Sequence, residues 1–350
     1  MQPGPGGLTE RAGRAYIPPV SRMKMVPLVL ALNPSIDAEW RVDQVRSQEK
    51  NEVTAERRWP GGKGVNVARW LKHLGAPARL LLPLGGETGR ELAGRLRTEG
   101  LPARVVRVSQ ATRVNVIVTP ESGPQFRFNP VWQQISSTDW ATVLDAIRQA
   151  LRNASCVVLS GSLPAGAPLD AYARIIRLAA RAGVRCILDC DGPALAAAVR
   201  AKPFLVKPNE HELARWYAVE PSSDADIRRA ARAMASVTRG WVLVSRAERG
   251  AWLVHEQERM ALECVAPRVR VRNTVGAGDA LLAGVVERIL GGAAPSEWLR
   301  WGVACGSAAA GCMGGALPKT VASMGRKVVV GEGGSVGWPV RGGWDASGGP

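Results

Sequence analysis

The sequence contains little of what builds a disulfide framework, a metal cluster or a membrane span. It has six cysteines, none in a Cys-x-x-Cys pair, and three scattered histidines. This pattern favours reduced thiols in a packed core over disulfide bonds or a zinc site. No apolar run is long enough to cross a bilayer, and the first residues lack the charged-then-apolar pattern of an export signal. We therefore expect a cytoplasmic protein with no membrane partner.

Acidic residues are scarce relative to basic ones. The 46 lysine and arginine residues outnumber 30 aspartate and glutamate residues, which gives a net charge of +16. Such a charge confers nonspecific affinity for phosphate backbones. The excess is nearly all arginine, however, and no basic arm, zinc finger or helix-turn-helix pattern accompanies it. We expect no specific nucleic-acid partner, and anionic small substrates account for part of the charge.

The apolar residues, 46% of the chain, form short runs that alternate with helical patterns. The predicted strands are residues 26–32, 80–84, 104–108, 157–160, 185–189, 204–206 and 241–245, and the predicted helices are residues 91–97, 170–182 and 194–200. This alternation predicts an α/β fold whose parallel sheet is covered by helices on both faces. Residues 1–24 are expected to be a disordered lead-in and residues 321–350 a disordered tail, which leaves residues 25–320 as the folded domain.

Two other stretches are typical of a small exposed sheet. Residues 37–59 are polar with intermittent β-branched residues, and residues 112–119 and 125–128 alternate on either side of a turn, as in a hairpin. We assign residues 37–59 and 111–130 to one flap. Arg113 and Arg127 on the hairpin either point toward an anion or face solvent.

A glycine-rich stretch, Asn273 to Gly284, is the motif that points most directly to chemistry. The alternating residues 264–272 before it predict a strand, and apolar residues at helical spacing follow it. Small residues at a helix start let backbone N–H groups converge on an anion. Asp279 would repel that anion, but its position makes sense if it takes a proton from a nucleophile that attacks a phosphoryl group. A plain glycine-rich turn with an acid at the helix start fits this motif alone equally well.

A second glycine loop, Gly61-Gly62-Lys63-Gly64, also leads into a helix, with Asn66 in its first turns. It fits neither a Walker A loop nor the Gly-x-Gly-x-x-Gly dinucleotide pattern. Such a loop suits a hydroxyl-rich ligand, because the Asn66 amide can bridge two hydroxyls and Lys63 can meet a phosphate. A tight turn with a solvated lysine is the alternative.

Polar residues also follow two of the predicted strands. Asp37 comes after strand 26–32, at the edge where open α/β sheets bind ligands. Asn209 and Glu212 lie three apart at a helix start and so share a face, where they could orient Mg²⁺ through water. On spacing alone, helix capping by Asn209 with a first-turn glutamate is the preferred interpretation.

Together the motifs resemble those of the PfkB-type (ribokinase-like) carbohydrate kinases, in the branch of 1-phosphofructokinase, tagatose-6-phosphate kinase and the minor 6-phosphofructokinase. Six motifs occur in the family's order, at residues 33–37, 61–69, 112–115, 160–164, 207–212 and 273–284. The resemblance covers about residues 26–315. It implies a ribokinase-like three-layer α/β/α fold with a mostly parallel central sheet and a small β-sheet lid. In the family such a lid closes over the sugar and often pairs with a second subunit's lid, which implies a homodimer.

The resemblance also implies a role for each motif residue. Asp279 would be the catalytic base, and ATP and Mg²⁺ would be the cofactors. The sugar phosphate would be held by Asp37, Gly62, Lys63, Asn66 and Arg113, with Lys63 and Arg113 facing its existing phosphate. ATP would be held by Lys207, Ser245, Gly250 and Thr274, with Gly276, Ala277 and Gly278 as the anion hole for the γ-phosphate. Mg²⁺ would be positioned through water by Asn209 and Glu212.

The implied reaction transfers the γ-phosphoryl group of ATP to a ketohexose monophosphate, giving a bisphosphate. The sequence leaves open whether this is fructose 1-phosphate, fructose 6-phosphate or tagatose 6-phosphate. The lysine in residues 61–64 favours fructose 1-phosphate or tagatose 6-phosphate, whereas Lys50 and residues 125–128 look more like the 6-phosphofructokinase type.

Two stretches depart from the family pattern. The family usually has Ser-Leu-Gly where this chain has Ser245-Arg246-Ala247, and a glycine-containing segment where this chain has residues 129–132. Alanine at a position that needs a special backbone angle would weaken ATP binding. The alternative function is therefore a catalytically weak sugar-phosphate-binding protein with an impaired nucleotide site.

Overall fold

The structure is a computed structural model that describes residues 26–131, 134–218, 223–257, 259–313 and 315–332. The expected lead-in at residues 1–24 lies outside this part of the chain. Within it, no helix is long and apolar enough to cross a membrane.

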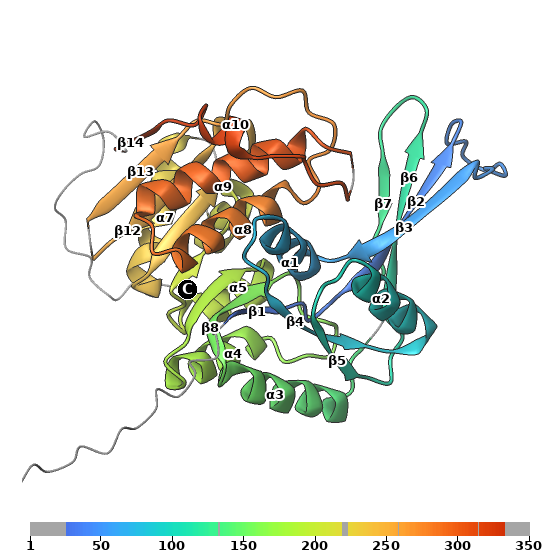
Figure 1. The fold of residues 1–350 in the computed structure, drawn as a ribbon, viewed down its shortest axis with the longest axis horizontal. Coiled ribbons are helices and arrows are strands. Elements are labelled where there is room, and N and C mark those ends of the chain that lie inside the picture. Colours follow the sequence, from blue (N-terminus) through green and yellow to red (C-terminus); the bar gives the residue numbers. More distant parts are fainter. Residues whose placement is uncertain (1–25, 132–133, 219–222, 258, 314, 333–350) are drawn as a thin grey trace, which may run out of the picture.

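A ten-stranded sheet forms the centre of the molecule (Figure 1), in the order β14-β13-β12-β11-β10-β9-β8-β1-β4-β5. Its strands are β1 (Val26–Leu30), β4 (Arg79–Leu84), β5 (Ala103–Arg107), β8 (Ala154–Ser160), β9 (Arg185–Asp189), β10 (Leu205–Val206), β11 (Trp241–Ser245), β12 (Ala251–His255), β13 (Met260–Cys264) and β14 (Val330–Glu332). In this order, all strands from β11 through β1 to the edge strand β5 are parallel, and β12, β13 and β14 pair antiparallel on the other side of β11. Apart from the partly exposed edge strand β5, the parallel strands are short apolar runs because both of their faces are buried.

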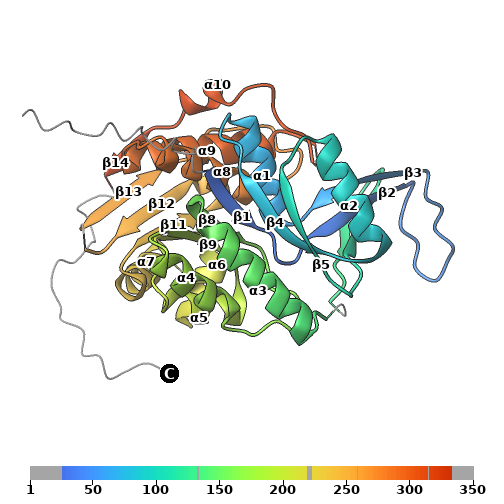
Figure 2. The same ribbon diagram turned by 60° about the horizontal axis from the view of Figure 1, so that its bottom comes forward.

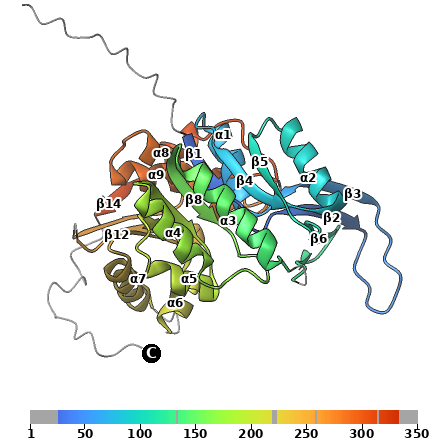
Figure 3. The same cartoon turned by 90° about the horizontal axis from the view of Figure 1, so that it is seen from below.

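Helices cover both faces of the sheet (Figures 2 and 3). One layer contains α1 (Lys63–His73), α2 (Gly86–Thr98), α8 (Ala277–Leu290) and α9 (Pro295–Ala310), and the other contains α3 (Ser137–Leu151), α4 (Ala171–Arg181), α5 (Gly192–Val199), α6 (Glu210–Tyr217) and α7 (Asp224–Thr238). Successive side chains of β8 alternate between two cores, with Val157 and Leu159 in one and Cys156 and Val158 in the other. The predicted three-layer α/β/α arrangement is confirmed.

A separate four-stranded sheet, which we call the lid, projects from the body (Figure 1). Its strands are β2 (Ser35–Val42), β3 (Ala55–Gly61), β6 (Arg113–Pro120) and β7 (Phe126–Phe128), in the order β3-β2-β6-β7. The predicted hairpin is present, since β6 pairs antiparallel with β7. Glu91 of α2 fixes the base of the lid, because its carboxylate contacts Arg58 of β3 at 2.8 Å and Arg95 at 2.9 Å.

Two expectations about irregular segments are wrong. Residues 265–272 are not a strand; β13 stops at Cys264, because Pro267 lacks an N–H and Val265 and Val271 are exposed rather than buried in a sheet. Residues 321–332 are not disordered. They form the short helix α10 (Ala322–Gly325) and β14, which is held by its pairing with β13. The rest of the expected tail lies outside the described residues.

Candidate active site

The charged motif residues converge at one edge of the central sheet. The parallel strands β1, β9 and β10 end there, and α1, α6 and α8 begin there. Since ligands of open α/β sheets bind outside the carboxyl ends of the strands, the fold itself positions these side chains for binding.

Asp279 lies in the first turn of α8 and is buried. The Asn66 side-chain amide of α1 donates a 2.8 Å hydrogen bond to its Oδ2 atom. Burial, together with the nearby charge of Asp189, raises the pKa of Asp279 to about 6. A carboxylate with that pKa is ionised at neutral pH and still basic enough to accept a proton, so it suits a general base.

The loop before Asp279 presents the start of α8 to the site. Gly276 is the N-cap, with φ of 80°, and no side chain in the described part of the chain caps the helix. The Thr274 carbonyl accepts a hydrogen bond from the Ala277 N–H at 3.2 Å, which closes the turn. A Cβ on Gly278 would lie 3.6 Å from the Lys207 ammonium, so a lysine stands directly beside the helix start. Helix dipole and ammonium together favour an anion at this point.

Asp189 is a site residue that the sequence analysis missed. Its side chain, at the end of β9, is 1% exposed, and its Oδ1 atom lies 3.2 Å from Lys63 Nζ and 3.4 Å from Lys207 Nζ. Burial alone would raise its pKa, but the two ammonium groups hold the pKa of Asp189 below its ordinary value. The available signal was its place as an acid ending a buried strand, the same argument that selected Asp37.

Lys63 faces buried acidic side chains. Besides Asp189, its ammonium lies 3.8 Å from Glu212 Oε1. Burial disfavours its charge, but Asp189, Glu212 and Asp279 outweigh that effect and raise its pKa above the ordinary value. The expected partner in phosphate binding, Arg113, instead donates to the Asn33 carbonyl at 3.2 Å.

Asn209 and Glu212 form a complete capping box. Asn209 Oδ1 accepts from the Glu212 N–H at 2.8 Å, and Glu212 Oε2 accepts from the Asn209 N–H at 2.9 Å. The capping interpretation preferred on spacing is therefore correct. The cap engages one carboxylate oxygen of Glu212, whose other oxygen is the one near Lys63.

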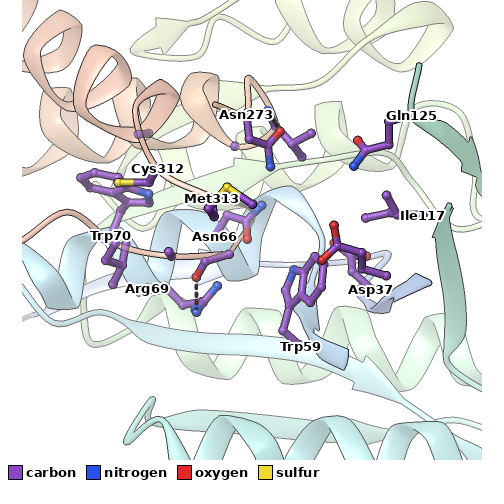
Figure 4. Close-up of a pocket in the computed structure, with 17 residues that line it drawn as sticks. Asp37, Trp59, Asn66, Arg69, Trp70, Ile117, Gln125, Asn273, Cys312 and Met313 are labelled. Carbon is purple, nitrogen blue, oxygen red and sulfur yellow. Dashed lines mark hydrogen bonds between the residues drawn. The ribbon is translucent and has the colours of Figure 1, made fainter. Parts of the chain in front are cut away.

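A pocket lies between the lid, α1, the start of α8 and the segment after α9 (Figure 4). Asp37, Asn66 and Gly276 line it together, so three predicted site residues share one cavity. Asp37 Oδ1 accepts hydrogen bonds from Asn115 at 2.8 Å and from Ser35 at 2.9 Å, and burial raises the pKa of Asp37.

Glycines allow the chain to approach these residues closely. A Cβ on Gly61 would lie 2.2 Å from Asp37 Oδ1, so any side chain there would displace the carboxylate. Gly62, with φ of 98°, is the N-cap of α1. The pocket also contains residues without an earlier assignment, namely Trp59 and Gln125 of the lid region and Arg69 of α1. Arg69 donates to the Gly315 carbonyl at 3.0 Å (Figure 4). Arg69 belongs to the motif at residues 61–69, Gln125 to the hairpin stretch at residues 125–128 and Trp59 to the flap, but no binding role was expected for any of them.

The turn between β11 and β12, which we call the 245–250 turn, reaches the same sheet edge. Ser245 forms a bridge with Asn209 and donates its N–H to the Pro208 carbonyl at 3.0 Å. Gly250 has φ of 92°, and a Cβ there would meet the Cys264 carbonyl oxygen at 2.0 Å. Ala247 has φ of 50°. The special backbone angle inferred at Ala247 is thus present. Of the other departure, residues 129–132, Trp132 lies outside the described residues.

Comparison with known proteins places this chain in a described family. Residues 23–321 match the family model of the pfkB family carbohydrate kinases. The chain is 35% identical over 283 residues to ATP-dependent 6-phosphofructokinase isozyme 2 of Escherichia coli (strain K12), covering 80% of this chain and 91% of that protein. It is 34% identical over 281 residues to 1-phosphofructokinase of Bacillus subtilis (strain 168), covering 80% and 91%.

Solved structures of phosphofructokinases also resemble the fold of this chain. The crystal structure of phosphofructokinase-2 from Escherichia coli in complex with potassium superposes with a TM-score of 0.81 at 33% identity, covering 86% of this chain and 98% of that one. A structure described as the tetrameric inhibited form of the same protein gives a TM-score of 0.80 at 32% identity, covering 87% and 99%.

Proposed function

Because this chain belongs to the pfkB family of carbohydrate kinases, we propose that Asp279 is the base with which it transfers the γ-phosphoryl group of ATP to a ketohexose monophosphate. The chain is a kinase, a phosphotransferase with an alcohol acceptor, and an ATP-dependent sugar-phosphate kinase like its relatives. The observation that carries the residue assignment is the single pocket where Asp37, Asn66 and Gly276 meet, with Asp279 hydrogen-bonded to Asn66.

In the proposed step a free sugar hydroxyl attacks the γ-phosphorus in line with the bond to ADP. Asp279 takes the hydroxyl proton, the new O–P bond forms, and the bond between the γ-phosphorus and the ADP oxygen breaks. Gly276, Ala277 and Gly278, at the start of α8, and the adjacent Lys207 ammonium would stabilise the charge on the transferring group. The products are ADP and a hexose bisphosphate.

The residues at this edge also fit Mg²⁺. Asp189 Oδ2 is buried and has no hydrogen-bond partner among the described residues. Glu212 keeps one oxygen outside its cap, and Asn209 lies in the same helix turn. Mg²⁺ prefers oxygen ligands and retains waters, so Asn209 and Glu212 would hold it through water. When bound, Mg²⁺ would neutralise charge on the nucleotide phosphates.

The sugar phosphate would bind under the lid. Asp37, Gly62 and Asn66 would contact the sugar, and Arg113 would meet its phosphate. Arg113 is suited to this because its Nε atom is buried and without a hydrogen-bond partner among the described residues. We also propose that Lys63 turns from Asp189 toward a substrate phosphate when one is bound. Lid closure would exclude water, which competes as a phosphoryl acceptor.

ATP would bind beside the 245–250 turn, with Ser245, Gly250 and Thr274 near its phosphates. The alternative, a sugar-phosphate-binding protein with an impaired nucleotide site, rests on the left-handed Ala247. The intact surroundings of Asp279 favour the enzyme.

For assembly we propose a homodimer formed through the lid. Trp40, Phe126 and Phe128 are large apolar side chains exposed on the lid strands, and such groups are typical of interfaces. Light scattering of Phe128→Asp should give a smaller particle than the unaltered chain, whereas Leu169→Asp, at an exposed position of the body, should not. Equal masses for all three would contradict a lid interface.

The function is tested by ADP release from ATP and Mg²⁺ with fructose 6-phosphate, fructose 1-phosphate, tagatose 6-phosphate and unphosphorylated fructose. Turnover on one phosphorylated sugar supports the proposal and identifies the substrate. Absence of turnover on all four, with a sugar phosphate still raising the melting temperature, would instead support the binding protein.

A further inference from the structure

The 245–250 turn holds a conformation that its sequence does not favour. Ala247 is left-handed, with φ of 50°, and its side chain is exposed, so burial against the described residues does not hold it there. This region of backbone space is disfavoured for every residue except glycine. Two backbone hydrogen bonds close the turn. The Arg246 N–H donates to the Gly250 carbonyl at 2.9 Å, and the Gly250 N–H donates to the Ala247 carbonyl at 3.1 Å.

The arginines on either side of Ala247 are both fixed by the same two acids. Arg246 Nε lies 2.8 Å from Glu210 Oε1, and Arg246 also contacts Asp224. Arg249 contacts Glu210 as well and lies 3.1 Å from Asp224 Oδ1. We call these four residues the arginine clamp. Because each acid contacts both arginines, the backbone between them has little freedom.

The clamp is anchored in the body of the protein. The Arg246 side chain is 7% exposed, and its guanidinium stacks over the Trp252 ring, 3.6 Å from the ring centroid. Glu210 directly follows Asn209, and Asp224 is the first residue of α7. The clamp therefore joins the 245–250 turn to the start of α6, where Asn209 is bridged to Ser245.

We propose that the arginine clamp is a positioning device that holds the 245–250 turn in its ATP-binding conformation despite the alanine at position 247. This inference rests on the proposed nucleotide site. It implies that the nucleotide site is intact rather than impaired. The ion pairs on both sides of residue 247 hold the left-handed conformation that a glycine would adopt without support. None of the four clamp residues is required to touch ATP.

The test combines a clamp variant with a restored glycine. Arg249 is suited to substitution because its side chain is 53% exposed, so Arg249→Ala should fold. Arg174→Ala is the matched control, since Arg174 is 52% exposed and pairs with Asp170 on α4. Arg174→Ala also removes one positive charge, but at a site away from the turn. It therefore controls for the general electrostatic attraction between ATP and a basic protein.

The dissociation constant of Mg²⁺-ATP is measured by calorimetry without sugar, and KM and kcat are measured in the turnover assay. Arg249→Ala should raise the ATP dissociation constant and KM roughly three- to tenfold. The KM for sugar phosphate and kcat should stay nearly unchanged, because the lost effect is on nucleotide binding. Arg174→Ala should change none of these constants.

Rescue distinguishes positioning from direct contact. Ala247→Gly added to Arg249→Ala should return ATP binding to near the unaltered value, since glycine adopts the left-handed conformation without support. Unchanged ATP binding in Arg249→Ala, or a loss that Ala247→Gly does not reverse, would overturn the proposal. The calorimetric result does not depend on turnover, so failure of the proposed reaction would appear separately, as ATP binding without product.

Discussion

The amide of Asn66 donates a 2.8 Å hydrogen bond to the carboxylate of Asp279, although 213 positions separate the two residues in the sequence. The contact joins the first turns of α1 and α8, and so joins the two glycine loops of the chain. It places a group that is suited to hold a sugar hydroxyl directly against the candidate base. The activity of Asp279 should therefore depend on Asn66 as well as on its own burial.

Replacing Asp279 should remove the chemical step and leave binding. We expect Asp279→Ala to lower kcat about 10²- to 10⁴-fold, the usual contribution of a general base. Sugar phosphate should still raise the melting temperature of the variant, because Asp37, Gly62 and Arg113 remain. Normal turnover by Asp279→Ala would show that another group is the base.

The pH profile should report the ionisation of Asp279. Its carboxylate must be ionised to accept a proton, so with a pKa of about 6 we expect kcat/KM to fall as the pH drops below about 6. The Asn66 hydrogen bond lowers this pKa, so Asn66→Ala should move the acid limb to higher pH.

Substrate phosphates also titrate near this pH, so a second amide variant serves as the control. Asn115 donates to Asp37 rather than to Asp279. Asn115→Ala should raise the KM for sugar phosphate and leave the acid limb in place. If both variants moved the limb equally, the limb would not belong to Asp279.

Asp279 should also cost the enzyme stability. Its folded-state pKa of about 6 lies above the ordinary value of 3.8, so burial penalises the ionised form. The contribution of Asp279 to stability is therefore most favourable below pH 3.8, and it is lost as the pH rises through about 6. The difference between these two pKa values means that ionisation of Asp279 lowers the free energy of unfolding by an amount on the order of 3 kcal/mol. Asp279→Asn should therefore raise the melting temperature at pH 8 but not at pH 3.5, and equal shifts at both pH values would contradict this.

A single methyl group at Gly61 should damage the sugar site. A Cβ there would lie 2.2 Å from Asp37 Oδ1, so Gly61→Ala must displace the carboxylate. We expect a rise in the KM for sugar phosphate with little change in the KM for ATP. Gly94→Ala on α2 is the control, since a Cβ at Gly94 would meet no atom of the described residues within 4 Å. Alanine in place of glycine within a helix should raise the free energy of unfolding by about 0.5–1 kcal/mol. An unaffected sugar KM in Gly61→Ala would remove Asp37 from the sugar site.

The sequence predicted those features that local patterns determine. The alternation of buried runs and helices predicted the layers, and the alternating hairpin stretches predicted the lid. The three-residue spacing of Asn209 and Glu212 predicted their cap. The left-handed angle at Ala247 was also readable, because the chain departs there from the family's glycine.

Other features depend on pairings between distant segments, which local patterns do not contain. Asp189 forms ion pairs with Lys63 and Lys207 only because β9 ends beside the start of α1 and beside the segment after β10. Residues 330–332 are a strand only because they pair with β13. Residues 265–272 alternate like a strand, but no strand among the described residues pairs with them.

The pairing of β14 with β13 has a further consequence for the far end of the chain. The family match ends at residue 321, yet the strand that follows pairs with residues 262–264 of β13. The last of these, Cys264, has its carbonyl so close to Gly250 that a Cβ there would lie 2.0 Å from the oxygen. A chain shortened to the family boundary would leave β13 as an exposed edge strand with unpaired N–H and C=O groups. Such edges recruit strands from other molecules, so we expect β14 to protect this edge of the central sheet from aggregation.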